Sequence, residues 1–119
     1  MSDDDLLPAF EKLKQAASTL PEVQESLSYG TPALRVGKKM LSRVKDPDTV
    51  VLMCPLEEKE MLMAAAPDIY FETDHYKGWP ALLARIHEIP LDELSHRLEQ
   101  TFLRTAPKKL VKAWRDAKG

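Results

Sequence analysis

The sequence of 119 residues is poor in cysteine, glycine and histidine, and these shortages exclude several classes of protein. Cys54 is the one cysteine, so no disulfide can form within the chain and a secreted disulfide scaffold is excluded. The sequence has four glycines and contains no glycine-rich phosphate loop, nucleophile elbow or HExxH motif. Its first residues are acidic where a signal peptide is basic, and no apolar run is long enough to cross a membrane. We therefore expect a cytoplasmic protein that does not associate with membranes.

The residue types that most often carry catalysis or bind metals are isolated from one another. His75, His87 and His96 are the three histidines, and no two of them have the spacing of metal ligands. Cys54 ends an apolar segment without a neighbouring base, which favours a buried structural thiol over a nucleophile. The sequence therefore predicts no metal site, no cofactor and no enzymatic activity.

Composition predicts one ordinary globular domain over residues 1–119. Apolar residues make up 44% of the chain and charged residues 30%, and a chain of this length can bury a core without disulfides. The net charge of −2 argues against a dedicated nucleic-acid-binding protein.

The charge is unevenly distributed along the chain. Residues 1–28 are acidic on balance, whereas residues 35–45 contain basic side chains and no acidic one. A second basic segment lies near the C-terminus. The basic side chains concerned are Arg35, Lys38, Lys39, Arg43 and Lys45 in the first segment, and Lys108, Lys109, Lys112 and Arg115 in the second. These groups either form solvated surface or attract an anionic partner.

Apolar spacing predicts helices near both ends of the chain. Apolar residues recur every three or four positions over residues 3–18 and again over 91–106, which is typical of helices that pack on a sheet. A short second helix is expected from Pro21 to Gly30, with Val23 and Leu27 facing inward, because proline suits a first turn and glycine ends a helix.

The middle of the chain predicts strands with one inserted helix. Gly37 and Lys38 separate two strand-like segments by the spacing of a tight hairpin, and Pro55 and Pro67 bound a helix. The predicted strands cover residues 33–36, 39–45, 49–54, 69–73 and 81–89. The order of elements is that of an α+β domain with a mostly antiparallel sheet of about five strands, covered by the N-terminal and C-terminal helices. The expected core includes Phe10, Leu13, Val51, Leu52, Phe71, Leu82, Ile86, Leu98 and Phe102.

The stretch TDHYKGWPALLARI, residues 73–86, lies where the chain turns between two predicted strands. Gly78 lets the connection bend and Pro80 fixes the entry to the next strand. The side chains of His75, Tyr76 and Trp79 then have three interpretations: they cover the sheet edge, line an aromatic binding pocket, or take part in catalysis. The first is favoured, with His75 fixing the connection through hydrogen bonds.

The hairpin around Gly37 has two interpretations. Its glycine and the Thr31-Pro32 pair are sufficient to explain a purely structural hairpin. Alternatively, the hairpin projects from the sheet as a wing whose basic turn lies against a nucleic-acid backbone. Lysines in such a wing would hold phosphates rather than distinguish bases.

Several segments in the same order resemble the MmcQ/YjbR family of small bacterial proteins. They are YGTPALRVGKKMLSRV, the block VVLMCPLEEKEMLMAAAPDIYFETDHYKGWPALLARI, and APKKLVKAW, so the resemblance extends roughly from Leu20 to Trp114. The most specific parts are Gly30-Thr31-Pro32, the segment from Phe71 to His75-Tyr76 with Gly78 and Pro80, and Ala106-Pro107-Lys108. The resemblance implies a YjbR-like fold in which helices pack on one antiparallel sheet, and no catalytic motif.

Members of that family are commonly labelled DNA-binding, and two hypotheses of function follow. The first is weak, non-specific DNA binding by a monomer through the basic hairpin, helped by the C-terminal basic segment. The second is a protein-interaction or small-ligand-binding domain that uses the sheet face and the aromatic corner at residues 75–80.

Overall fold

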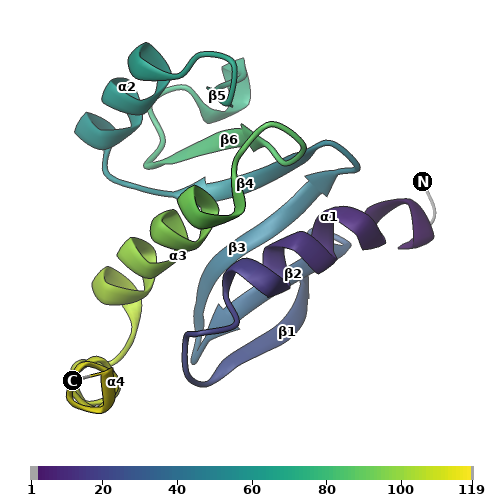
Figure 1. Ribbon diagram of the computed structural model, residues 1–119. Helices are drawn as coiled ribbons and strands as arrows, with labels where there is room; N and C mark the ends of the chain where they lie inside the picture. Colours follow the sequence, from purple (N-terminus) through teal and green to yellow (C-terminus); the bar gives the residue numbers. More distant parts are fainter. Residues whose placement is uncertain (1–2, 119) are drawn as a thin grey trace.

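The computed structural model describes residues 3–118, so residues 1, 2 and 119 of the predicted single domain lie outside the described residues (Figure 1). Its helices are α1 (Asp3–Ala16), α2 (Leu56–Ala65), α3 (Leu91–Thr105) and α4 (Lys108–Lys118), with a short 3₁₀ helix η1 (Asp74–Tyr76). Its strands are β1 (Val23–Ser28), β2 (Thr31–Val36), β3 (Lys39–Asp46), β4 (Thr49–Met53), β5 (Tyr70–Phe71) and β6 (Ala81–Arg85). Across the described residues, these strands form one antiparallel sheet in the order β1-β2-β3-β4-β6-β5. The α+β class and the antiparallel sheet are confirmed.

Helices α1 and α3 cover one face of the sheet and enclose the main core (Figure 1). Alternate residues of the central strands point to this face, with Leu52 of β4 opposite Leu82 of β6 in the register. Leu13 of α1 and Leu98 of α3 are fully buried against them. Within residues 3–118, no helix is long and apolar enough to span a membrane.

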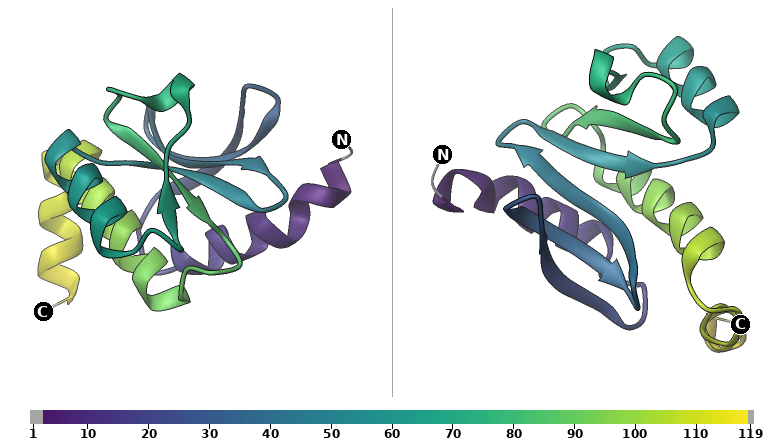
Figure 2. Two further views of the ribbon diagram at one scale, coloured as in Figure 1. Left: turned by 90° about the horizontal axis from the view of Figure 1, so that it is seen from above. Right: turned by 180° about the vertical axis from the view of Figure 1, so that it is seen from behind.

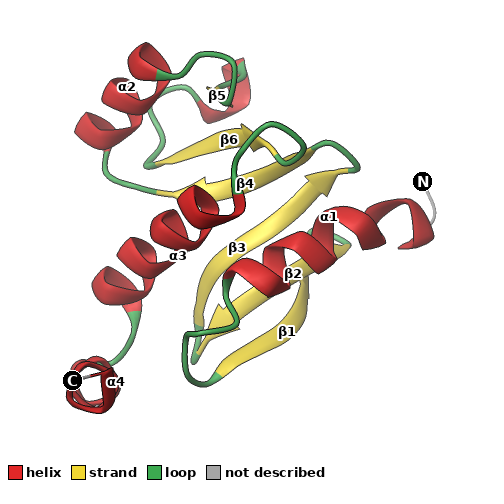
Figure 3. Ribbon diagram, viewed as in Figure 1, coloured by secondary structure: helices red, strands yellow, loops and turns green. Residues whose placement is uncertain are grey.

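The opposite face, which we call the open face, carries a second and smaller apolar cluster. Val51, Ala81 and Leu83 are its buried members. In the left view of Figure 2, the β1–β2 turn and the corner segment, residues 72–80, both rise from this face, away from α1 and α3. The corner segment is a loop apart from η1 (Figure 3).

The short helix predicted from Pro21 to Gly30 is wrong, because this segment forms β1 and a tight turn. Val23 and Leu27 are four residues apart, a spacing that places two side chains on one face of a strand as well as of a helix. Backbone pairing with β2 decides between the two. Gly30 does adopt a left-handed conformation, with φ of +78°, but in the β1–β2 turn.

The predicted hairpin exists, but it is not a projecting wing. Val36 pairs with Lys39 around Gly37, whose φ is +61°. However, β2 is flanked by β1 and β3 is flanked by β4, so both arms lie inside the sheet. The extra strand β1 is what encloses the hairpin.

The register of β5 also differs from the expected core. Tyr70, not Phe71, is buried in the main core, with 2% of its surface exposed, whereas Phe71 is half-buried on the open face. The Tyr70 hydroxyl donates a hydrogen bond of 2.5 Å to Glu93, which makes burial of this polar side chain tolerable. The other expected core residues are buried, and β6 ends at Arg85 rather than at residue 89.

Candidate functional site

A cavity of about 620 Å³ lies on the open face, between the corner segment and the β1–β2 turn; we call it the open-face pocket. Strand residues Met40, Val51, Met53 and Ala81 supply apolar lining. Tyr29, His75, Tyr76 and Trp79 supply aromatic lining, so the pocket contains all three residues predicted for an aromatic site. Arg43 and Lys45 of β3 add two cationic side chains.

Arg43 is the most buried charged residue of this pocket, with 9% of its surface exposed. Its Nη2 donates a hydrogen bond of 2.9 Å to the Tyr76 hydroxyl, and its Nη1 donates one of 3.2 Å to Thr31 Oγ1. The guanidinium also lies 5.1 Å from the centre of the Tyr29 ring, within cation–π range. Arg43 therefore connects β3, the corner segment and the β1–β2 turn.

The aromatic side chains of the corner segment are arranged against one another. His75 meets Tyr76 edge to face at 5.1 Å between ring centres and stacks with Trp79 at 6.4 Å, with 15° between the planes. Trp79 is 60% exposed although it is large and apolar. An exposed indole beside an apolar cavity is a surface on which a flat ligand can stack.

Lys59 of α2 holds the corner segment in place, although it was not among the residues predicted for the site. Its ammonium group, 2% exposed, donates to the carbonyl oxygens of Tyr76 at 2.6 Å and Trp79 at 3.0 Å, and lies 3.6 Å from a carboxylate oxygen of Glu72. Lys59, rather than His75, therefore holds the connection. Lys59 falls in a series of otherwise apolar residues at helical spacing, and this pattern indicates that its side chain is buried. The series is Leu56, Lys59, Leu62, Met63 and Ala66.

Lys45 also lines the open-face pocket, and the other predicted basic residues lie elsewhere. Arg35, Lys38 and Lys39 are exposed on β2, the hairpin turn and β3, and Lys45 is half-buried with Asp46 at 3.9 Å. Lys108, Lys109, Lys112 and Arg115 are exposed on α4.

Two contacts place α4 and the hairpin turn at the same end of the molecule. Trp114 of α4 donates a hydrogen bond of 3.1 Å to the Thr19 carbonyl oxygen, just before β1. Val23 at the start of β1 pairs with Val36, which precedes the hairpin turn. The hairpin turn and α4 thus lie at one end of the molecule, whereas Arg43 lines the pocket.

Cys54 and the histidines do not form a reactive cluster. Cys54 is 6% exposed, and burial raises the pKa of its thiol to about 11, so the neutral thiol predominates near neutral pH. Among residues 3–118, no three histidine, cysteine, aspartate or glutamate side chains are grouped so that they could hold a metal ion.

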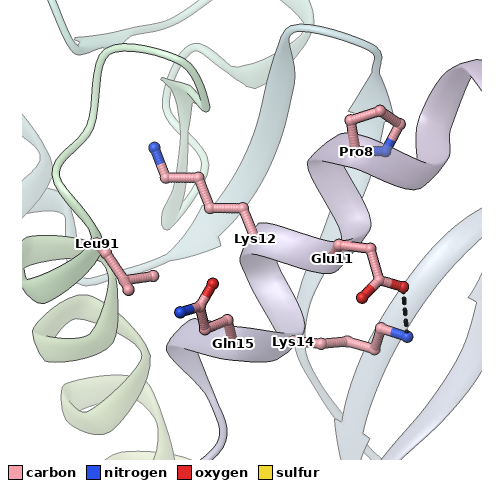
Figure 4. Close-up of a pocket in the computed structure, with 6 residues that line it drawn as sticks. All are labelled: Pro8, Glu11, Lys12, Lys14, Gln15 and Leu91. Atoms are coloured by element: carbon pink, nitrogen blue, oxygen red, sulfur yellow. Dashed lines mark ion pairs between the residues drawn. The ribbon is translucent and has the colours of Figure 1, made fainter.

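A second hollow, of about 830 Å³, lies between α1 and the start of α3 (Figure 4). It is a shallow groove whose cations are already engaged. Lys12 donates to the carbonyl oxygens of Ile86 at 2.6 Å and Ile89 at 2.7 Å, and Lys14 pairs with Glu11 at 2.9 Å. The hydrogen bond that Lys14 donates to the Glu11 carboxylate is also the main cause of the raised pKa of Lys14. These contacts join α1 to its surroundings and leave the open-face pocket as the better candidate site.

The fold and the pocket together define a small α+β protein with helices on one sheet face and an aromatic, cationic pocket on the other. The model of the YjbR family matches residues 18–104, and the chain belongs to this family. The matched residues include every residue that lines the open-face pocket.

Two mycobacterial proteins are similar to this chain in sequence, and one solved structure is similar to it in fold. Uncharacterized protein Rv2570 of Mycobacterium tuberculosis and Uncharacterized protein Mb2600 of Mycobacterium bovis are each 41% identical over 56 residues, covering 47% of this chain and 43% of theirs. The match thus covers less than half the length of these relatives. The crystal structure of Deinococcus radiodurans protein DR2400, with a DUF419 domain, superposes with a TM-score of 0.69 at 20% identity, over 91% of this chain and 86% of that one. This likeness supports the fold.

Proposed function

We propose that this YjbR-family protein is a non-catalytic binding module whose small-molecule ligand occupies the open-face pocket. The observation that carries the proposal is the pocket itself: an apolar floor of strand residues with aromatic side chains on two sides. Its volume of about 620 Å³ falls in the usual range for ligand sites. The floor belongs to a regular sheet and the corner segment is held by the buried Lys59, so the site is formed before a ligand arrives.

Ligand-observed NMR with a set of one- and two-ring aromatic compounds tests this proposal. We expect binders that lose about two- to tenfold in affinity when Trp79→Ala removes one stacking surface. Met61→Ala is the matched control, because Met61 is equally exposed at 63% but lies on α2, outside the pocket lining. If no compound binds, or if the two variants weaken binding equally, the proposal is wrong.

A second candidate function is non-specific nucleic-acid binding by the exposed cations. The observation that favours it is that the hairpin turn and α4 lie at one end of the molecule. Such binding would have a dissociation constant of about 10⁻⁴–10⁻⁶ M and would weaken steeply as salt rises. Arg43 is excluded from this surface because it is buried.

A low-salt shift assay with duplex DNA examines this second candidate. Reversing the charges of Lys38, Lys39 and Lys112 together should abolish the shift, whereas Lys77→Glu in the corner segment should leave most of it. Absence of a shift with the parent protein would eliminate nucleic-acid binding.

A further inference from the structure

We infer that the ligand of the open-face pocket is an anion, a carboxylate or a phosphate monoester, attached to a flat aromatic body, and that Arg43 binds its charged group. This inference rests on the proposed function, since it names the chemistry of the ligand at the same site.

The charge of Arg43 is buried without an anionic counterion among the described side chains. A guanidinium is protonated at every physiological pH, and removing it from water is costly unless an anion accompanies it. Among the side chains that the structure describes, no carboxylate pairs with Arg43. By contrast, the less buried Arg97 has a carboxylate oxygen of Glu58 at 2.6 Å. Arg97 thus has a counterion within the protein, whereas the more buried Arg43 lines a cavity and has none among the described side chains.

The neutral partners of Arg43 orient the guanidinium without using all of its donors. Thr31 Oγ1 and the Tyr76 hydroxyl each accept one hydrogen bond, and the Val44 carbonyl oxygen lies at the limit of 3.5 Å. Five N–H donors are available on a guanidinium, so donors remain for a carboxylate or phosphate. Because the Tyr76 oxygen accepts from Arg43, its own O–H hydrogen is free to donate to the same anion.

Aromatic rings lie next to this cation. Tyr29 lies against the guanidinium, and the stacked rings of Trp79 and His75 line the pocket from the corner segment. A ligand whose anionic group reaches Arg43 therefore places its remainder between flat apolar surfaces. The volume of about 620 Å³ accommodates a body of one or two rings.

Isothermal titration calorimetry with four probes tests the inference: 2-naphthoate, 2-naphthyl phosphate, the neutral 2-naphthamide, and acetate as an anion without a ring. We expect at least one charged naphthyl probe to bind about tenfold or more tightly than the amide. Acetate should bind too weakly to detect, because it cannot use the rings. Comparing naphthoate with naphthyl phosphate identifies which anion the site prefers.

Variants then test whether Arg43 causes the preference for the charged probes over the amide. In Arg43→Met, which keeps the apolar stem, the affinity of the charged probe should fall to that of the amide, while the amide changes by less than about threefold. Arg35→Met is the matched control, because Arg35 is an exposed arginine of β2 outside the pocket lining; the preference should persist there. If Arg43→Met fails to fold, judged by circular dichroism, Tyr76→Phe serves instead and should reduce the preference while retaining amide binding.

The outcomes separate the inference from the proposed function. If the amide binds the parent protein as tightly as the charged probes, the inference is overturned and the pocket remains a ligand site. Equal loss of amide and anion in Arg43→Met would assign Arg43 a structural role and also overturn it. If no naphthyl probe binds and the aromatic compound set also fails, the proposed function itself is wrong.

Discussion

Lys59 is the residue on which the shape of the pocket most depends. Its ammonium group donates hydrogen bonds to two carbonyl oxygens of the corner segment, those of Tyr76 and Trp79. The same ammonium lies close to Glu72, so it offsets a partly buried carboxylate as well. A hydrophobic side chain of equal length would fill the volume but leave these oxygens unpaired.

We therefore expect Lys59→Met to lower the free energy of unfolding by about 1–3 kcal/mol, measured by chemical denaturation. Lys77→Met, which removes an exposed lysine from the corner segment, should change it by no more than about 0.5 kcal/mol. Amide hydrogen exchange of Tyr76 and Trp79 should also accelerate in the first variant. Equal stability of the two variants would show that the buried ammonium is not what holds the segment.

The raised pKa of Cys54 gives a second prediction at the level of residues. Burial favours the neutral thiol, so the pKa rises from 9.0 to about 11 on folding. The corresponding stability is present below pH 9 and is lost as pH rises toward 11, because the unfolded chain then releases the proton more readily. Cys54→Ala should remove this part of the pH dependence. Alkylation by iodoacetamide at pH 8 should be slow in the folded protein, and rapid alkylation would mean that the thiol is accessible.

At this scale, the sequence identified the aromatic residues of the site but not the function of Arg43. His75, Tyr76 and Trp79 flank a glycine and a proline, which is a local pattern. The position of Arg43 depends instead on which sheet face the helices cover and on Tyr76, 33 residues further along the chain. No local pattern contains that information.

Among the elements, the β1–β2 turn contains a residue in a strained backbone conformation, Tyr29, which also lines the pocket. Tyr29 and Gly30 both have positive φ, of 53° and 78°, as two-residue hairpin turns require. Glycine adopts this conformation freely, but for a tyrosine it costs about 1 kcal/mol. The strained residue is the one whose ring lies against Arg43.

Tyr29→Asn should accordingly raise the free energy of unfolding by roughly 0.5–1 kcal/mol, because asparagine tolerates the left-handed region. The same variant should weaken binding of the aromatic ligand, since one ring of the pocket is gone. Tyr29→Phe keeps both the strain and the ring, so it should resemble the parent in both measurements. Destabilisation by Tyr29→Asn would indicate that the ring contributes more to packing than its 90% exposure implies.

The two faces of the sheet should differ in their contribution to stability. Leu98 of α3 is fully buried in the main core, and Leu98→Ala should cost about 2–5 kcal/mol. Phe71 is half-buried in the smaller cluster, so Phe71→Ala should cost about 1–2 kcal/mol despite the larger side chain. Thermal or urea denaturation measures both. A larger cost at Phe71 would mean that the open face, not the helix-covered face, contains the main core.

The elements were predictable where a single period explained the apolar pattern, as in α1, α3 and the β2–β3 hairpin. They were not predictable where a spacing fits two structures. Val23 and Leu27 satisfy a helix and a strand alike, and only long-range pairing with β2 selects the strand. The hairpin was expected to project from the sheet as a wing, whereas β1 pairs with β2 and places the hairpin inside the sheet.

In the molecule as a whole, the two faces of the one sheet are unlike. One face is covered by α1 and α3 and contains the main core, while the other carries a cavity with aromatic walls and a buried cation. The exposed cations lie toward a different region, at the end where α4 contacts the segment before β1. Ligand binding in the pocket and attraction of a polyanion are therefore separable by mutation.

The most direct test is a ¹H–¹⁵N correlation titration of the full chain with 2-naphthoate. We expect the largest amide shift changes to cluster around the pocket, in the β1–β2 turn, in β3 near Arg43 and in the corner segment. Small changes should occur in α4 and in the groove between α1 and α3. Largest changes in α4 or in that groove, with an unperturbed corner segment, would contradict the assignment of the open-face pocket as the binding site.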